Sequence, residues 1–303
     1  MPVAIAPTGL NDLIHPHGDL LLARAAQAAG LPFIQSAASL TAAPALAGLD
    51  ADAGWQQLYI HDRHAIPQLA ADYAAAGTRV LIVSVDVPTG GVRWHERRLP
   101  PALRPSWRTA AAAIRCPRWL GRHLWARALR RTQYQRALPQ AFVDRQFDVN
   151  LGWDDLARLR NCWPQRLLIK GILHPDDACR ARDIGFDGAI VSNHGGRQLE
   201  CASSAWTMLP AIRSAVGNAF PLLADGGVRT GEDVIKALTT GASAVLVGRL
   251  PVWALAAGGA DLLDVTLADL SGQIAIAMQL CGCHSLADIG CLNGAQQLNE
   301  PQL

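Results

Sequence analysis

Apolar positions along the chain gather in eight short runs, with longer alanine- and leucine-rich stretches between them. Short apolar runs rich in β-branched residues are typical of buried strands. The longer stretches, such as 20–29 and 66–76, each end at a glycine, Gly30 or Gly77, which can serve as a helix stop. The pattern therefore predicts parallel βα units. The predicted strands are 3–7, 32–35, 56–60, 80–85, 167–169, 189–191, 221–223 and 244–247.

The number of these units decides between two α/β architectures. Eight units favour a (β/α)8 TIM barrel over a doubly wound sheet, which more often has fewer strands and begins with a glycine-rich turn. The first run ends in Ala6-Pro7-Thr8-Gly9, which is not a dinucleotide-binding fingerprint. We expect residues 1–303 to form a single barrel domain, with a closing helix at 262–280.

A basic segment interrupts the alternation between the fourth and fifth strands, at about 89–164. From Arg97 to Val143 there are eleven arginines and no Asp, Glu or Lys, whereas the whole chain has a net charge of only +2. We expect an inserted, solvated lid over the barrel mouth, followed by the fourth helix. Adsorption of 97–143 to an anionic membrane or a partner is the alternative. Nucleic acid is disfavoured because no binding module surrounds the charge.

The cellular compartment and the presence of a metal site are predicted from weaker sequence signals. No apolar run approaches the roughly 18 residues of a membrane span, and the N-terminus has no basic region typical of a signal peptide. The seven cysteines show no CxxC spacing. We therefore expect reduced thiols, no zinc site and a cytoplasmic protein. Because of the basic segment, we also consider that the protein contacts the inner face of the membrane.

Polar residues follow nearly every predicted strand. In a barrel, residues just past the strands all face one mouth, whatever their separation in sequence. A barrel used only as a scaffold would not need such a polar mouth. The residues at these strand ends, all polar except the three glycines, are Thr8, Ser36, Gln57, Tyr59, Ser84, Asp86, Lys170, Ser192, His194, Asp225, Gly226, Gly227, Gly248 and Arg249.

The motif at 192–200, Ser-Asn-His-Gly-Gly-Arg-Gln-Leu-Glu, comes directly after the sixth predicted strand. A histidine titrates near neutral pH and can move protons, and an arginine offers a planar fork that suits a carboxylate. His194 and Arg197 therefore indicate an acid/base group beside an anion clamp. A capping cluster that closes a strand-to-helix turn is the alternative.

A second glycine-rich motif lies at 225–229, Asp-Gly-Gly-Val-Arg, and Gly248-Arg249 follows the last predicted strand. Glycines let the backbone approach a ligand closely, and barrels commonly bind phosphate in the loops after strands seven and eight. With Arg229 and Arg249 supplying charge, these loops predict a phosphate site. Two ordinary tight turns are the alternative.

Four further residues suit the same mouth. Lys170 is one of only two lysines in the chain, and it ends the fifth predicted strand. A compact ammonium there suits a developing negative charge, or a rim salt bridge. Asp86 can orient a histidine, Arg93 can complete a carboxylate clamp, and Tyr59 can bond a substrate oxygen. Each of the latter three has an equally good structural interpretation.

Taken together, these motifs resemble the FMN-dependent 2-hydroxy-acid dehydrogenases and oxidases, which include glycolate oxidase, L-lactate dehydrogenase and mandelate dehydrogenase. The resemblance extends from Pro2 to Cys283 and is carried by the motifs at 192–199, 225–229 and 248–249. It implies an enzyme that uses FMN to oxidise an L-2-hydroxy acid to a 2-oxo acid.

The resemblance also implies roles for individual residues. His194 removes a proton, Asp86 pairs with it, and Lys170 stabilises negative charge on the reduced flavin. Tyr59, Arg93 and Arg197 address the substrate. The implied FMN contacts are Pro7, Thr8, Gly9, Ser36, Gln57, Ser84, Lys170, Ser192, Asp225, Gly226, Gly227, Arg229, Gly248 and Arg249.

Partners and alternative functions stay open at this stage. The electron acceptor is oxygen or a quinone, and we expect a homo-oligomer. A flavin-dependent modifier of a peptide or biosynthetic intermediate is a second hypothesis, although Arg197 would then lack an obvious purpose. An inactive, N-terminally truncated FMN-binding remnant is a third, opposed by the presence of His194, Arg197, Lys170 and Asp86.

Two departures from the family bear on the site. Members usually carry a helical segment before the barrel that supplies a further tyrosine, whereas here the first predicted strand begins at Val3. We expect either a truncated chain or a site that works without that tyrosine. Small residues at 36–39, Ser-Ala-Ala-Ser, replace a bulkier family residue and leave room for a larger substrate side chain.

Overall fold

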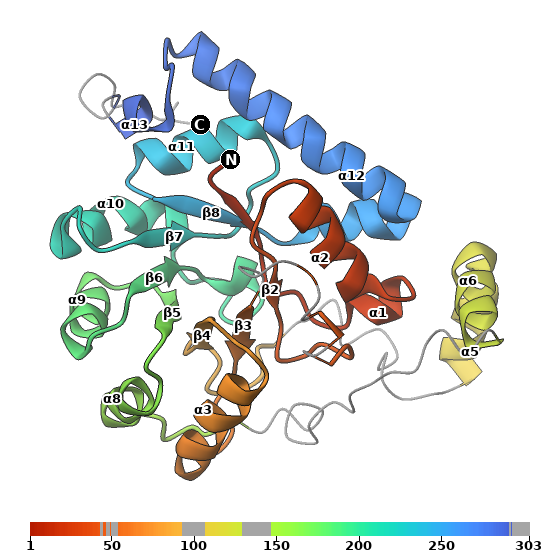
Figure 1. Ribbon diagram of the computed structural model, residues 1–303, viewed down its shortest axis with the longest axis horizontal. Coiled ribbons are helices and arrows are strands. Elements are labelled where there is room, and N and C mark those ends of the chain that lie inside the picture. Colours follow the sequence, from red (N-terminus) through yellow and green to blue (C-terminus); the bar gives the residue numbers. More distant parts are fainter. Residues whose placement is uncertain are drawn as a thin grey trace.

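Eight parallel strands form a nearly closed barrel in the computed structural model, which describes residues 1–42, 45–46, 49, 54–92, 107–128, 147–290 and 292 (Figure 1). The sheet order is β1-β8-β7-β6-β5-β4-β3-β2. A bridge between Ile5 and Phe33 joins β1 to the start of β2. The predicted (β/α)8 barrel is thereby confirmed. The strands are β1 (Val3–Ile5), β2 (Ile34–Gln35), β3 (Trp55–Leu58), β4 (Val80–Ser84), β5 (Arg166–Ile172), β6 (Gly188–Val191), β7 (Leu222–Ala224) and β8 (Ala244–Val247).

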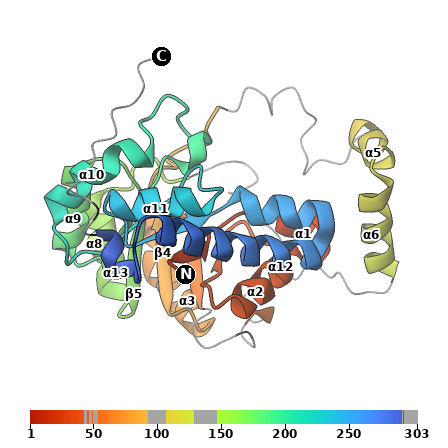
Figure 2. The ribbon, with the colours of Figure 1, turned by 90° about the horizontal axis from the view of Figure 1, so that it is seen from above.

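Helices surround this barrel, as both ribbon views show (Figures 1 and 2). Several begin or end with caps that the sequence provides. Thr230 and Asp233 form a capping box at the start of α11, and Gly185 ends α9 in the left-handed conformation. The helices are α1 (Asn11–Ile14), α2 (Gly18–Ala28), α3 (Ile66–Ala75), α5 (Trp107–Ile114), α6 (Pro117–Ala128), α8 (Trp153–Cys162), α9 (Pro175–Ile184), α10 (Ala205–Val216), α11 (Gly231–Thr239), α12 (Arg249–Leu280) and α13 (Leu286–Ile289), with short 3-10 helices η2 (Arg63–Ala65) and η3 (His194–Gly196).

The strands divide their side chains between two apolar layers. Because successive residues of a strand point to opposite faces, Leu81, Val83 and Ile169 pack outward against the helices, whereas Ile82 and Leu168 fill the barrel interior. The interior cluster also contains Ala4, Ala6, Ile34, Val80, Ile190, Leu223 and Leu246.

Helix α12 begins earlier than the sequence pattern indicated. It starts at Arg249 rather than near 262, and a bend at Gly259 (φ 71°) falls within it. The sequence pattern predicted only the second half of α12, because the bend interrupts the helical spacing of its apolar residues. By length and composition alone α12 could cross a membrane. It nevertheless packs on α2 and α11 and buries Leu255, Leu263 and Leu267, as a core helix does.

Between residues 97 and 143, the described residues form α5 and α6. These helices stand at the side of the barrel beyond α1, not over its mouth, in both views (Figures 1 and 2). Trp119 Nε1 donates a hydrogen bond to the carbonyl oxygen of Leu13 in α1 at 2.8 Å. The position predicted for a lid therefore does not hold for residues 107–128, while 93–106 and 129–146 lie outside the described residues.

Candidate active site

The polar residues of the site continue the inward-facing rows of the barrel. Ile82 is followed two positions later by Ser84, Leu168 by Lys170, and Ile190 by Ser192. The strand period of two therefore turns each polar side chain into the barrel, just above the interior apolar layer. Ser36, Gln57, Asp225 and Gly248 continue their own rows in the same way.

His194 and Asp86 form a hydrogen-bonded pair at this end of the barrel. His194 Nδ1 lies 3.0 Å from Asp86 Oδ2, and the side chains are 20% and 13% exposed. Burial opposes ionisation of Asp86, but the hydrogen bond from His194 and the positive charge of Lys170 hold the pKa of this carboxyl below its ordinary value. An ionised Asp86 fixes the imidazole with Nδ1 protonated, so Nε2 is the nitrogen free to accept a proton.

A bulge in β5 makes room for Asp86. Gly171 has a φ of 100°, and the register between β5 and β6 shifts at this point. A Cβ on Gly171 would lie 2.6 Å from Asp86 Cβ and Cγ, so only glycine allows this approach.

The loop after β6 is held in an unusual conformation. His194 has a φ of 57°, which is rare for a residue with a side chain, and Gly195 and Gly196 continue in the left-handed region. Asn193 Oδ1 accepts a hydrogen bond from the Gly196 amide, and Gly91 donates one to Gln198 Oε1 at 2.9 Å. Strained histidines of this kind gather at functional sites.

Lys170 forms a buried ion pair with Asp225. The distance from Nζ to Asp225 Oδ2 is 3.0 Å, and Nζ also donates to Ser192 Oγ at 2.8 Å. The Lys170 side chain is 3% exposed. The other oxygen of Asp225 is buried without a hydrogen-bond partner, so it is an acceptor available to a ligand hydroxyl or N–H.

Gln57 connects three neighbouring strands. Its Oε1 accepts from the amide of Ala37 at 3.1 Å and from Ser36 Oγ at 3.5 Å, and its Nε2 donates to Ser84 Oγ at 3.1 Å. This arrangement fixes donors and acceptors at the ends of β2, β3 and β4, next to the pair formed by His194 and Asp86.

The loop after β7 has the geometry of an anion site. Gly226 and Gly227 have φ values of 98° and 91°, and Trp206 Nε1 bonds the Gly226 carbonyl at 2.6 Å. The Arg229 guanidinium lies over the ring of Trp253, 5.5 Å from its centroid. The sequence does not predict that Trp253 belongs to the site, because its contact with Arg229 joins α12 to this loop only in the folded chain.

These groups surround one cleft of about 440 Å³. Its lining includes most of the residues predicted from sequence, together with unpredicted ones such as Leu10, Asn11, Ile14 and Trp253. Gln57, Ser84, Asp86 and Ser192 support this lining from behind, and Arg93 lies outside the described residues. The predicted lining residues are Pro7, Thr8, Gly9, Ser36, Tyr59, Lys170, His194, Arg197, Asp225, Gly226, Gly227, Arg229, Gly248 and Arg249.

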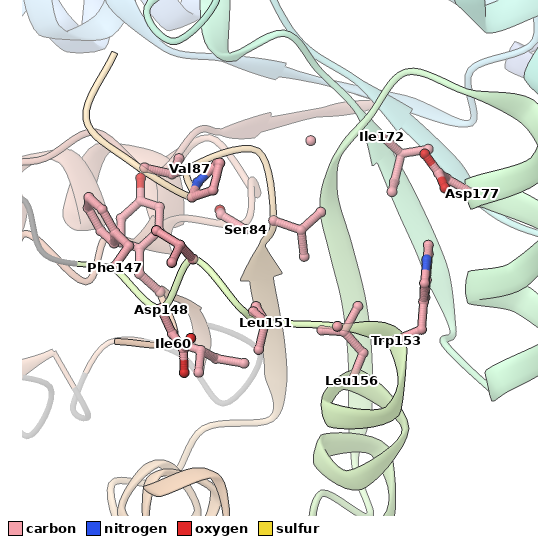
Figure 3. A pocket seen from close by; sticks show the side chains of 16 residues that line it. Ile60, Ser84, Val87, Phe147, Asp148, Leu151, Trp153, Leu156, Ile172 and Asp177 are labelled. Atoms are coloured by element: carbon pink, nitrogen blue, oxygen red, sulfur yellow. The ribbon is translucent and has the colours of Figure 1, made fainter. Parts of the chain in front are cut away.

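A second cavity, of about 280 Å³, lies behind the barrel wall between the ends of β4 and β5 and helix α8 (Figure 3). Trp153, Leu156 and Ile172 line it, and Tyr59 belongs to both cavities. Tyr59 packs edge-on against Phe147, with ring centroids 5.4 Å apart. The second cavity therefore borders the back of a predicted substrate residue.

Comparison with known sequences places the chain in a family. Residues 1–293 match the sequence model of the family described as FMN-dependent dehydrogenase. The chain belongs to this family. An L-lactate dehydrogenase of Caulobacter vibrioides (strain NA1000 / CB15N) is 38% identical over 303 residues, covering 95% of this chain and 78% of the relative. One from Xanthomonas axonopodis pv. citri (strain 306) is also 38% identical, with 95% and 77% covered.

Solved structures of family members share the fold. A crystal structure of the monotopic membrane protein (S)-mandelate dehydrogenase has a TM-score of 0.85 and 35% identity, covering 95% of this chain and 79% of that chain. Mandelate oxidase has a TM-score of 0.79 and 36% identity, covering 95% and 77%. The protein is thus an FMN-dependent enzyme that acts on the CH–OH group of 2-hydroxy acids, as the sequence motifs predicted.

The cleft suits FMN chemically. Arg229 and Arg249 bring two positive charges to the glycine turns after β7 and β8, where barrels commonly hold phosphate. The unpartnered oxygen of Asp225 is an acceptor for a hydroxyl such as those of the ribityl chain. Lys170 supplies a buried cation for a ring that becomes anionic on reduction. None of the six cysteines in the described part of the chain forms a disulfide.

Proposed function

We propose that the protein oxidises an L-2-hydroxy acid to the 2-oxo acid, with His194 as the base. The observation that carries this proposal is the pair formed by His194 and Asp86, whose histidine lines the cleft while its aspartate supports it from behind. Asp86 holds Nδ1, so Nε2 takes the substrate proton, and the ionised carboxylate stabilises the imidazolium that results.

The remaining residues bind and orient the substrate. Arg197 lines the cleft beside His194 and supplies a fork for the substrate carboxylate. Tyr59 also lines this cleft, and we propose that its hydroxyl bonds a substrate oxygen. The Gly91 amide donates a hydrogen bond to the side chain of Gln198, the residue after Arg197. We propose from the sequence that Arg93, two residues after Gly91, is the second arginine that binds the substrate carboxylate. FMN, when bound, accepts the two electrons that leave the substrate.

The substrate side chain has more room here than a bulky residue after β2 would leave. Ala38 borders the cleft with a side chain of a single methyl group. Relatives act on lactate or mandelate by their names. We propose that this cleft accepts side chains larger than the lactate methyl group, with the acid itself to be identified by screening.

One experiment tests the reaction and the base. The protein is purified with FMN, and a panel of L- and D-2-hydroxy acids is added without oxygen while the flavin spectrum is recorded. At least one L-acid should bleach the oxidised band, and His194→Ala should retain the flavin but lose the bleaching. His174→Ala, at an exposed histidine, is the matched control. A protein that cannot be reconstituted with FMN, or a His194→Ala variant that bleaches at the rate of the unmodified protein, contradicts the proposal.

We further propose that α5 and α6 attach the enzyme to an anionic membrane. A position at the membrane favours a quinone as the electron acceptor, and oxygen is the alternative. Trp107, Ile114, Leu124 and Trp125 are between 58% and 76% exposed. The two helices contain arginines but no acidic residue. Exposed tryptophans beside arginines suit the membrane interface, and a structural relative is named a monotopic membrane protein.

A further inference from the structure

Two carboxyl groups are buried where the loop after β1 meets the loop after β2. Asp12 belongs to α1 and Asp19 to the first turn of α2, and their exposed fractions are 5% and 0%. Within the described part of the chain neither forms an ion pair. A buried carboxylate without a cation is costly unless it is hydrogen-bonded or protonated, so the contacts of this pair need an explanation.

Asp19 ties the two loops together. Its Oδ1 accepts a hydrogen bond from Asn11 Nδ2 at 2.7 Å, and the same Asn11 nitrogen donates to the carbonyl oxygen of Thr8 at 2.9 Å. Its Oδ2 accepts a hydrogen bond from the hydroxyl of Ser39. The Leu10 amide also bonds the Ala38 carbonyl at 3.1 Å. One carboxyl group thus connects the chain after β1 to the chain after β2.

Asp12 completes the connection from the other side. Thr41 Oγ1 donates to Asp12 Oδ2 at 3.0 Å, and the backbone N–H groups of Gly18 and Asp19 also bond the Asp12 carboxyl. Asp12 therefore caps the start of α2. The approach is close, because a Cβ on Gly18 would lie 2.3 Å from the Asn11 carbonyl oxygen.

Burial and mutual repulsion hold a proton on this pair of acids to a higher pH than on an exposed aspartate. Burial, and then the neighbouring charge of Asp12, raise the pKa of Asp19 from 3.8 to about 6. Burial also raises the pKa of Asp12. The last proton to leave belongs to the pair rather than to one residue. Once it leaves, two buried negative charges repel each other between the loops.

Other ionisable groups around the pair come from two elements. His17, which precedes α2, interacts electrostatically with Asp12. From α6, His123 Nε2 lies 3.2 Å from the Asp12 carbonyl oxygen, and Arg122 is near His15. The segment after β2 contributes Ser39 and Thr41, which do not ionise in this range.

We propose that Asp12 and Asp19 are positioning residues of the FMN site, and that protonation of this buried pair sets how firmly the site holds FMN. The proposal rests on the FMN contacts proposed for Thr8 and Ser36, which lie in the two loops that Asp19 connects. With the proton in place the loops are fastened together. Without it the carboxylates repel, the loops separate, and FMN is held less firmly.

The test measures FMN affinity by the fluorescence of released flavin at about pH 5 and about pH 8, in the full chain. The FMN phosphate itself titrates near about pH 6. Its contribution is common to all variants, so the comparison between variants isolates the carboxyl pair. Asp19→Asn and Asp12→Asn keep the size and hydrogen-bonding capacity of the side chain and remove the charge. Asp155→Asn, at the buried capping aspartate of α8, is the matched control.

Between the two pH values, the FMN dissociation constant of the unmodified protein should rise about tenfold more than that of Asp19→Asn. A tenfold change corresponds to a shift of about one pKa unit in the carboxyl pair when FMN binds. Asp12→Asn should behave like Asp19→Asn, and Asp155→Asn like the unmodified protein. Thermal unfolding of each apoprotein verifies that the variants are folded.

Two outcomes overturn the inference in distinguishable ways. If the protein binds FMN and oxidises a 2-hydroxy acid but Asp19→Asn follows the pH dependence of the unmodified protein, the carboxyl pair does not set FMN affinity, while the proposed function stands. If the unmodified protein binds no FMN at either pH, the proposed function and the inference fail together.

Discussion

Asp86 and His194 are 108 residues apart in the chain and 3.0 Å apart in the fold. They meet because Asp86 follows β4 and His194 follows β6, while the bulge at Gly171 in the intervening strand β5 opens a path between them. The aspartate is ionised and held by the histidine and by Lys170. This relationship links the fold to the proton transfer that we propose for His194.

Asp86→Asn should slow reduction of the flavin by substrate by about 100-fold or more, because the amide cannot stabilise an imidazolium. FMN binding should be unchanged, since Asp86 does not line the cleft. Anaerobic stopped-flow measurement of flavin bleaching tests this, with Asp155→Asn as control. A rate within about threefold of the unmodified protein would exclude Asp86 from the proton transfer.

Lys170→Met should destabilise the apoprotein by about 3 to 5 kcal/mol, because it leaves Asp225 buried and without its cation. The chain contains one other lysine, Lys236, which is exposed on α11. Lys236→Met should change the free energy of unfolding by less than about 0.5 kcal/mol. Urea unfolding of both variants measures the difference. Equal losses of unfolding free energy in the two variants would mean that the ion pair between Lys170 and Asp225 does not stabilise the apoprotein.

Gly91→Ala should weaken substrate binding. A Cβ at this position would lie 2.4 Å from the Arg197 carbonyl oxygen and 2.7 Å from Gln198 Cα, so the loop bearing Arg197 must shift. Overpacking of this kind costs about 1 to 3 kcal/mol, and we expect KM to rise about tenfold. Gly121→Ala in α6 meets no neighbouring atom and should leave KM unchanged. Steady-state kinetics with the best substrate test both, and an unchanged KM in Gly91→Ala would argue against this placement of Arg197.

Asp19 should make the apoprotein more stable in mild acid than at neutral pH. Its pKa is 3.8 ordinarily and about 6 in the fold, so between these values the folded state binds more protons than the unfolded state. The free energy of unfolding therefore falls as pH rises from about 4 to about 6, by about 3 kcal/mol, and is level above that. Urea unfolding across this range should show the fall in the unmodified protein and a flatter curve in Asp19→Asn. Parallel curves would contradict the assignment.

Replacing Trp107 and Trp125 by serine should reduce binding to anionic vesicles by at least about tenfold, because both side chains are exposed on the α5 and α6 helices. The control replaces Ile276 and Leu280 on α12, which are 58% and 82% exposed and lie far along the chain from the basic segment. Flotation with vesicles that contain phosphatidylserine measures the binding. Equal binding by both double variants would locate membrane contact elsewhere.

Much of the site was predictable because a parallel barrel brings all strand ends to one mouth. The polar residues after the apolar runs, from Thr8 to Arg249, could be selected from the sequence, and most of them line the cleft or support it. The alternation of apolar and polar positions along each strand determined this, since it depends only on neighbours in the chain.

Other features depend on contacts between distant segments, and the tertiary structure alone decided them. The stacking of Arg229 on Trp253, the space that Gly171 leaves for Asp86, and the position of α5 and α6 beside α1 have no local signal. Nothing in the sequence around Asp12 and Asp19 predicts that they meet. Burial between two loops made them a coupled pair, because desolvation and mutual repulsion arise only when the fold removes both from water.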